Sequence, residues 1–158
     1  MKTKLVILVL LLATFSCEKT TDDTLTDADE IKIKEQVQEV ANTLFKGCRE
    51  VNSGLVLESS YESPDFVYVF NGTTMTYSEF SSALEDIYSK MTNQEVNIIH
   101  QKFAVLDNST VLYTANCTFL EHFKDGHSFL ADPAVMLFIF KKTDGRWRWI
   151  YGVESYGQ

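Results

Sequence analysis

Two acid–histidine pairs are the residues whose types and spacing come nearest to metal chemistry. Glu121 directly precedes His122, and Asp125 lies two positions before His127. Carboxylate and imidazole groups are zinc ligands, but neighbouring residues on a strand point to opposite faces of a sheet, so Glu121 and His122 cannot share one site. His127 falls in a turn between two predicted strands and is expected to face solvent. We therefore expect no metal site.

The other reactive groups are thiols and isolated carboxylates. Cys48 and Cys117 could form a disulfide in an oxidising compartment, but nothing in the sequence brings their Cα atoms within bridging range, so two buried free thiols are favoured. Glu154 and Glu121 are the candidates for a proton-transferring carboxylate. The sequence holds no glycine-rich phosphate loop, no nucleophile elbow and no His-Glu-x-x-His motif. We expect no cofactor and assign no other catalytic residue.

The composition is that of a folded, acidic chain. Of its 158 residues, 45% are hydrophobic and 13% aromatic, and the formal net charge is −8. Such a chain can bury a core, and its length fits one domain. Nonspecific nucleic-acid binding needs an excess of basic side chains, so we exclude nucleic acid as a partner.

The first residues resemble a secretory signal. Lys2 and Lys4 precede the apolar run of residues 5–13, which is shorter than the roughly 20 residues that span a bilayer. The run leads to Ser16-Cys17, which resembles the box of a Bacteroidetes-type bacterial lipoprotein. That resemblance implies removal of residues 1–16, a lipid anchor on Cys17 at a membrane, and a place in the cell envelope, on the periplasmic side of a membrane or at the cell surface. Simple secretion is the alternative.

An acidic segment separates Cys17 from the predicted domain. Residues 18–30 contain six acidic side chains and little that can be buried, so we expect residues 17–29 to form a lipidated flexible tether. Lys19 followed by Asp22-Asp23 also resembles a surface-export signal, and this interpretation stays open beside that of a solvated spacer. Residues 30–158 are expected to form a single domain.

The domain is expected to begin with helices and to end with strands. Apolar residues at helical spacing predict a long helix that begins near Ile31 and extends to Cys48, and residues 55–59 fit a short second helix. Thr76 and Glu79 form a capping box ahead of a third helix. Short turns join the last four strands as an antiparallel meander. The predicted strands are residues 66–70, 96–106, 110–123, 128–142 and 146–156.

One face of these strands gathers bulky apolar side chains. Alternation along the strands puts them on the same side: Phe66, Tyr68, Phe70, Tyr113, Phe119, Met136 and Phe138. This face forms either the wall of an apolar ligand pocket or an ordinary packed core. Pro133, which cannot donate to a ladder, marks a bulge or bend.

Two further strand patterns concern the outer surface of the sheet. Residues 134–140 are apolar at every position, so both faces of that strand must be covered, one by helices and the other most simply by a partner subunit. On the final strand, alternation separates Trp147 and Trp149 from the set Ile150, Gly152 and Glu154.

The order of elements resembles the nuclear transport factor 2-like superfamily, in particular its SnoaL-like and calcium/calmodulin-kinase association-domain branch. The Asn71-Gly72 turn after the first strand and the Asp144-Gly145-Arg146-Trp147 hairpin carry the resemblance, which covers about residues 30–156. It implies an α+β fold in which a curved antiparallel sheet forms a cone around N-terminal helices and leaves a pocket at its open end. It also implies a homodimer through the outer sheet face.

The resemblance also assigns roles to single positions. It turns Ile150 and Glu154 toward the pocket and the two tryptophans toward the dimer interface. A buried Glu154 would have a raised pKa, whereas a position near the chain end would leave it solvated. Ketosteroid isomerase has its general base where this chain has Phe70, and its oxyanion-hole acid where this chain has Met136 or Leu137, so that acid–base pair is absent here.

Three functions are compatible with these patterns. The first is a lipid-anchored module that binds a small apolar or aromatic molecule without catalysis. The second is an enzyme of the cyclase, dehydratase or isomerase type that uses Glu154 or Glu121, and the third is an accessory lipoprotein that acts through protein contacts. A cavity with a buried, pKa-shifted carboxylate favours the enzyme, a cavity without one favours the binding module, and a filled cone favours the accessory protein.

Overall fold

A computed structural model describes residues 25–157. In chain order the elements are α1 (Asp27–Arg49), α2 (Ser53–Glu58), β1 (Val67–Phe70), β2 (Thr73–Met75), α3 (Tyr77–Lys90), β3 (Met91–Asp107), β4 (Thr110–Phe123), β5 (Ser128–Thr143) and β6 (Arg146–Tyr156). The six strands form one sheet in the order β2-β1-β6-β5-β4-β3. The predicted signal peptide and Cys17 lie outside the described residues.

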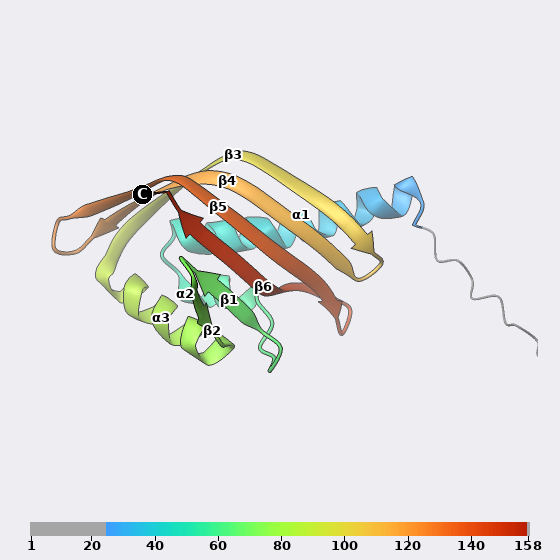
Figure 1. Cartoon of the computed structure of the whole chain (residues 1–158), viewed down its shortest axis with the longest axis horizontal. Coiled ribbons are helices and arrows are strands. Elements are labelled where there is room, and N and C mark those ends of the chain that lie inside the picture. The colour runs from blue at the N-terminus through green and yellow to red at the C-terminus, as the bar shows by residue number, and fades with distance from the viewer. Residues whose placement is uncertain (1–24, 158) are drawn as a thin grey trace, which may run out of the picture.

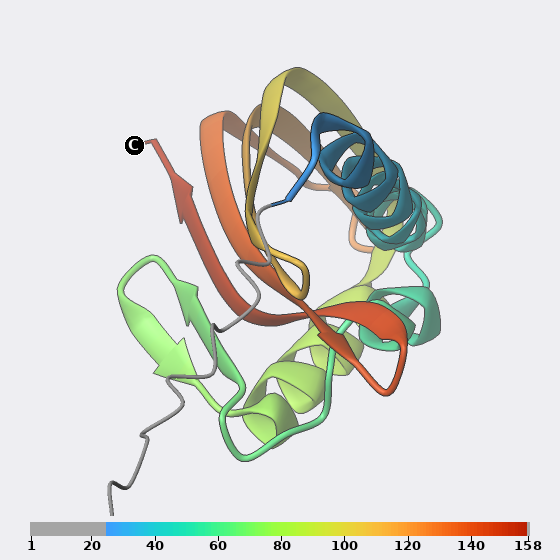
Figure 2. The same ribbon diagram turned by 90° about the vertical axis from the view of Figure 1, so that its right-hand side faces the viewer.

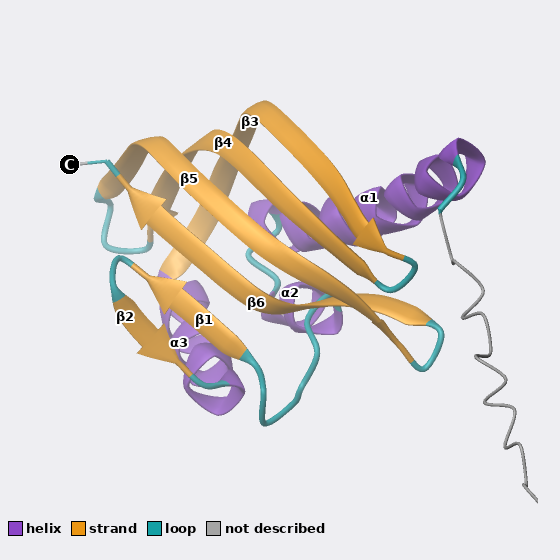
Figure 3. Cartoon of the chain, turned by 45° about the vertical axis from the view of Figure 1, so that its right-hand side comes forward, coloured by secondary structure: helices purple, strands orange, loops and turns teal. Residues whose placement is uncertain are grey.

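The sheet is strongly curved, and all three helices lie on its concave side (Figures 1 and 2). Strands β3 to β6 are long and arch over α1, while the short β1–β2 hairpin and α3 close the lower end of the cone (Figure 3). The predicted α+β cone is therefore confirmed. No helix within residues 25–157 is both long enough and apolar enough to cross a membrane.

Helix capping determines where two of the helices begin. Thr26 and Asp29 form a capping box at α1, and Thr76 and Glu79 form at α3 the capping box that the sequence predicts. Because α1 begins at Asp27, residues 27–29 are helical, and this end of the expected flexible tether is wrong. The carboxylates of the first turn face the positive end of the helix dipole, which favours helix over coil there.

The sheet differs from the predicted meander at one edge. Strand β1 runs parallel to β6, with Tyr68 opposite Gly152 and Phe70 opposite Glu154, so the sheet is not antiparallel throughout. The Asn71-Gly72 turn, with both residues at positive φ, leads into β2, a strand that the sequence did not predict. β3 begins at Met91, directly after α3, five residues before the predicted start.

Bulges in β3, β5 and β6 reset the alternation of side chains along these strands, and two of them bear on the predicted pocket face. Phe119 pairs with Ala131 and Cys117 with Ala134, which leaves an extra residue beside Pro133 in β5 and confirms the predicted bulge. The second bulge lies in β6, where Ile139 pairs with Tyr151 but Phe140 pairs with Trp149, so that Ile150 has no partner.

The bulge at Ile150 reverses the predicted faces of β6. Because one extra residue shifts the period of two, Trp149 faces the concave side together with Gly152 and Glu154. Trp149 is 1% exposed and its indole N–H donates to Ser59 Oγ at 3.1 Å, while Trp147 is also buried. The predictions that the tryptophans face outward and that Ile150 faces the pocket are therefore wrong.

The convex face of the sheet carries apolar side chains that nothing within residues 25–157 covers. Val135 is 49% exposed, and Leu137 and Ile139 beside it in β5 are only partly buried. Their inward-facing neighbours Met136 and Phe138 are buried in the core. The outward side of β5 is thus the part that lacks a cover among the described residues.

Candidate functional site

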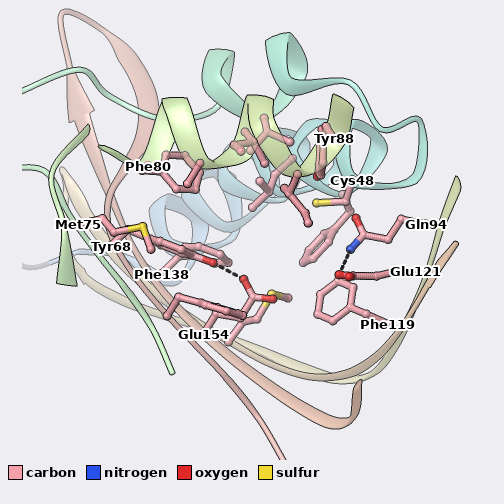
Figure 4. Close-up of a pocket in the computed structure, with 18 of the residues that line it drawn as sticks. Cys48, Tyr68, Met75, Phe80, Tyr88, Gln94, Phe119, Glu121, Phe138 and Glu154 are labelled. Carbon is pink, nitrogen blue, oxygen red and sulfur yellow. Dashed lines mark hydrogen bonds between the residues drawn. The ribbon is translucent and has the colours of Figure 1, made fainter. Parts of the chain in front are cut away.

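The cone holds a cavity of about 340 Å³, a size at the lower end of the range for small-molecule sites. It lies between α3, the C-terminal half of α1 and the concave face of the sheet (Figure 4). Most of the lining is apolar, and a few polar groups converge on it. The lining residues are Leu44, Phe45, Cys48, Val56, Tyr68, Phe70, Met75, Phe80, Ala83, Leu84, Ile87, Tyr88, Met91, Gln94, Phe119, Glu121, Met136, Phe138, Trp149, Glu154 and Tyr156.

Most of the residues that the sequence placed on a pocket face line this cavity. Those that do are Tyr68, Phe70, Phe119, Met136, Phe138 and Glu154, together with the second candidate acid, Glu121. Strands β1, β4, β5 and β6 bring them to one side because alternation holds along the parts of these strands that lie between the bulges.

Three predicted pocket residues lie elsewhere. Phe66 is buried just before β1, where its ring contacts those of Phe80 and Trp149. Tyr113 is buried deeper under α1 among other aromatic rings, and Ile150 is displaced by the bulge in β6. For Phe66 and Tyr113 the ordinary core is the correct interpretation.

Glu154 is held by two tyrosine hydroxyls. Tyr68 donates to one carboxylate oxygen, and Tyr156 donates to the other at 2.8 Å. Burial raises the pKa of Glu154 above its usual range, and the two hydrogen bonds oppose that rise because they stabilise the charged form. Glu154 is thus the buried acid that the resemblance implies, with its carboxylate oriented by its neighbours.

Gly152 makes room for one of these tyrosines. A Cβ atom at Gly152 would lie 2.9 Å from the rings of both Tyr68 and Phe138, closer than side-chain carbons pack. The rings therefore pack directly on the backbone of β6, and this close approach places the Tyr68 hydroxyl beside Glu154. Because β1 pairs in parallel with β6, Tyr68 lies opposite Gly152.

Glu121 is the second carboxylate of the cavity. It accepts one hydrogen bond, from Gln94 Nε2 at 3.0 Å, across the β3–β4 ladder. Burial raises its pKa, and the charge of Glu154 raises it further. Glu121 is therefore the acid of this mostly apolar cavity whose ionisation both burial and a neighbouring carboxylate oppose.

The histidines lie outside the cavity. The ring of His122 is 2.8 Å from Ser128 Oγ, and His127 stacks on Phe123 and pairs with Asp125 at the β4–β5 turn. Within residues 25–157, no three His, Cys, Asp or Glu side chains come together as a metal site.

The two cysteines of the domain are free thiols. Cys48 lines the cavity beside Tyr88, and Cys117 is buried under β5. Burial raises the pKa of each thiol to about 12, which keeps both protonated near neutral pH and makes them poor nucleophiles.

The helical wall of the cavity was not assigned from the sequence. Phe80, Leu84 and Tyr88 of α3 face the cavity, whereas the sequence predicted only where this helix begins. Gln94 was missed because β3 was expected to begin after it. Tyr156 could have been found, since it lies two residues beyond Glu154 on the same alternating face.

The raised pKa of Glu121 predicts how stability changes with pH. A carboxyl whose pKa is higher in the folded state binds its proton more tightly there. Its contribution to stability is complete below the unfolded-state pKa of about 4.3 and is lost as the pH rises through the folded-state pKa. We expect Glu121→Gln, which cannot ionise, to stabilise the protein relative to wild type at pH 8 and to lose that advantage toward pH 4. Urea unfolding across this range measures the difference.

The matched control is Glu95→Gln on β3. Glu95 is 65% exposed and faces His122 at 3.6 Å outside the cavity, where a surface pair contributes little. Its unfolding midpoints should follow those of wild type. An unchanged pH profile for Glu121→Gln would contradict the burial of this carboxylate.

Comparison with known proteins connects this geometry to a fold. No protein family matches the chain by sequence, and no curated protein matches it either. Solved structures do match. A proposed scytalone dehydratase from Novosphingobium aromaticivorans superposes with a TM-score of 0.75 at 7% identity, covering 84% of this chain and 89% of that one.

Two further solved structures are similar to this chain in fold. A proposed dehydratase of the NTF2-like family from Streptomyces avermitilis has a TM-score of 0.71 at 14% identity and covers 82% of this chain and 99% of its own. Hexachlorocyclohexane dehydrochlorinase from Novosphingobium barchaimii has a TM-score of 0.70 at 14% identity, and the match covers 84% of this chain and 92% of that one. At such identities the likeness concerns the fold alone. Residues 25–157 therefore adopt the nuclear transport factor 2-like α+β cone fold, with a cavity in its interior.

Proposed function

We propose that the protein is an enzyme that eliminates water, or a similar small leaving group, from a small and largely apolar molecule. One observation carries this proposal: two carboxylates with raised pKa, Glu154 and Glu121, face the same apolar cavity. Perturbed carboxyl groups in a cleft are typical of acid–base sites. From the sequence, a cavity with such a carboxylate is the feature that favours an enzyme over a simple binding module.

The surroundings of the two acids suggest different roles. Glu154 accepts two hydroxyl donors, which favour its ionised form, so it serves as the general base. Glu121 has one amide donor and feels the negative charge of Glu154, so it keeps its proton to higher pH and serves as the general acid. Environments that treat two acids differently are how acid and base roles are divided in enzymes.

The proposed step is balanced between these groups. Glu154 removes a proton from a substrate carbon, a carbon–carbon double bond forms, and the carbon–oxygen bond on the adjacent carbon breaks. The hydroxyl leaves as water with the proton of Glu121. Proton exchange with solvent then restores both acids. Two of the similar structures are proposed dehydratases and a third is a dehydrochlorinase, which supports an elimination.

A panel of small uncharged β-hydroxy ketones and aldehydes tests this function. Loss of water from any of them, followed by mass spectrometry and faster than in buffer, is the expected result. The reverse reaction in ²H₂O should place deuterium at the carbon from which Glu154 removes a proton. Tight binding of panel members without water loss or exchange would contradict catalysis and leave the non-catalytic binding module.

We also propose that the enzyme is held in the cell envelope by a lipid on Cys17. The support is the sequence of residues 1–17, which resembles a lipoprotein signal. In a bacterial host, Cys17→Ser is expected to abolish incorporation of labelled palmitate and to move the protein from the membrane pellet to the soluble fraction. Cys48→Ser is the matched control and should retain the label. If Cys17→Ser retained the labelled palmitate, or if Cys48→Ser lost it as well, the lipid anchor on Cys17 would be contradicted.

We propose in addition that two copies pair through the convex face of the sheet. The support is the outward-facing row of Val135, which is exposed, and Leu137 and Ile139, which are partly buried, since an uncovered apolar patch commonly marks an interface. Val135→Glu is expected to convert a dimer to a monomer in sedimentation velocity without lowering the thermal midpoint of the monomer. A wild-type protein that sediments as a monomer at micromolar concentration would contradict the dimer.

A further inference from the structure

Three hydrogen-bond donors of the cavity wall are already engaged. The hydroxyls of Tyr68 and Tyr156 both donate to Glu154. The indole N–H of Trp149 donates away from the cavity, to Ser59 Oγ. A tyrosine hydroxyl or an indole has one proton to donate, so none of these groups can donate to a ligand without leaving its present partner.

Hydrogen-bond acceptors, in contrast, remain free at the other acid. Gln94 gives its amide N–H to one oxygen of Glu121, while its own carbonyl oxygen is buried without a partner. Gln94 is only 6% exposed and lines the cavity. An unpaired buried acceptor costs free energy until a donor reaches it. In Figure 4 this Gln94–Glu121 pair lies across the cavity from Glu154.

The charges of the wall have a single sign. Its ionisable side chains are two glutamates, three tyrosines and a cysteine, and no lysine, arginine or histidine is among the lining residues. A negatively charged ligand would meet the Glu154 carboxylate, and that of Glu121 whenever it is ionised, with no cation to compensate, in surroundings of low polarity where repulsion is strong. A neutral or positively charged ligand meets no such barrier.

From the unpaired Gln94 oxygen and the single sign of the wall's charges we infer that the cavity takes a small hydrophobic molecule that bears a hydroxyl or amino group and carries no negative charge, and that it rejects carboxylates. The hydroxyl or amino group binds at the Gln94–Glu121 pair, and the hydrophobic body lies against Phe80, Leu84 and Phe138. The inference rests on the proposed function only in naming this ligand as the substrate. In that case its hydroxyl lies where Glu121 can protonate it.

Three ligands with one skeleton test the inference: 3-phenylpropan-1-ol, 3-phenylpropylamine and 3-phenylpropanoate. Isothermal titration calorimetry of the purified protein at pH 7.5 compares them. We expect the alcohol and the amine to bind at least about tenfold more tightly than the carboxylate, a difference of about 1.4 kcal/mol. Equal or tighter binding of the carboxylate would overturn the inference, and so would failure of both the alcohol and the amine to bind at millimolar concentration.

Variants of Gln94 and Glu121 show which groups produce the selectivity for the alcohol over the carboxylate. Gln94→Leu keeps the size of the side chain and removes the carbonyl acceptor, so the alcohol should lose about tenfold in affinity while the carboxylate is unaffected. Glu121→Gln should narrow the gap between alcohol and carboxylate, because it removes one negative charge. Glu95→Gln, the same change outside the cavity, should leave all three affinities unchanged, and a narrowed gap in this control would assign the selectivity to the overall charge instead.

Failure of this inference and failure of the proposed function give different results. Selective binding of the alcohol without any elimination would leave the ligand class standing and remove the catalytic role. Elimination from an anionic substrate would leave catalysis standing and remove the ligand class. A thermal unfolding curve for each variant identifies any loss of affinity that comes from misfolding.

Discussion

Glu154→Gln is expected to lower the turnover number by roughly 10²–10⁴-fold, the range for loss of a general base. Glutamine has nearly the same shape and can still accept a hydrogen bond from Tyr68 or Tyr156, but it cannot take a proton from a substrate carbon. The KM should change much less than kcat, because the apolar wall that holds the substrate is intact. Steady-state kinetics on a substrate from the β-hydroxy carbonyl panel measure both constants.

Two further variants test whether the loss of turnover comes from the Glu154 carboxylate itself. Glu95→Gln changes an exposed acid outside the cavity and should leave kcat unaltered. Tyr156→Phe removes one donor to Glu154, so the pKa of Glu154 rises and the ascending limb of the pH–rate profile moves to higher pH. Full activity of a folded Glu154→Gln variant would remove Glu154 from the mechanism.

Trp149→Ala is expected to lower the free energy of unfolding by about 3–5 kcal/mol, as for other buried aromatic side chains cut to alanine. Trp149 is 1% exposed, and its ring lies among those of Phe66, Phe80 and Phe138, with ring centroids 4.9 to 5.3 Å away. Its removal also leaves the Ser59 hydroxyl without its indole donor. Urea denaturation followed by circular dichroism measures the loss.

Ile150→Ala is the matched control, because it changes the neighbouring residue on the bulge. Ile150 is only partly buried and lies outside the cavity lining, so its truncation should cost less than half as much. If plain alternation held along β6, the order of the two effects would be reversed and Trp149→Ala would act on the outer face. If Trp149→Ala lowered the free energy of unfolding by less than Ile150→Ala does, the bulge at Ile150 would be contradicted.

The sequence contained enough to place most elements. Helical spacing of apolar residues located α1, and the Thr76–Glu79 capping box located the start of α3. Turn residues divided β4, β5 and β6 nearly at their observed ends. These signals are local, because a cap or a turn acts on neighbours within about four residues. The bulge beside Pro133 was predictable for the same reason, since proline lacks the amide proton that the ladder needs.

Features that depend on a partner strand could not be predicted. The bulge at Ile150 involves no proline or glycine, and only pairing with Ile139 and Phe140 reveals the extra residue. Alternation alone therefore placed Trp149 and Ile150 on the wrong faces. The parallel pairing of β1 with β6 joins segments about 80 residues apart, and no local pattern specifies such an edge.

By itself the sequence determined the α+β cone and the identity of Glu154 and Glu121 as the acids to consider. The tertiary structure alone decided that both face one cavity, that two tyrosines hold Glu154 and one amide holds Glu121, and that no basic side chain lines the cavity wall. The physical reason is that periodicity assigns a side chain to a face, whereas a cavity is the space that remains after distant elements pack. Its donors, acceptors and charges can be counted only once α1, α3 and the sheet have enclosed it.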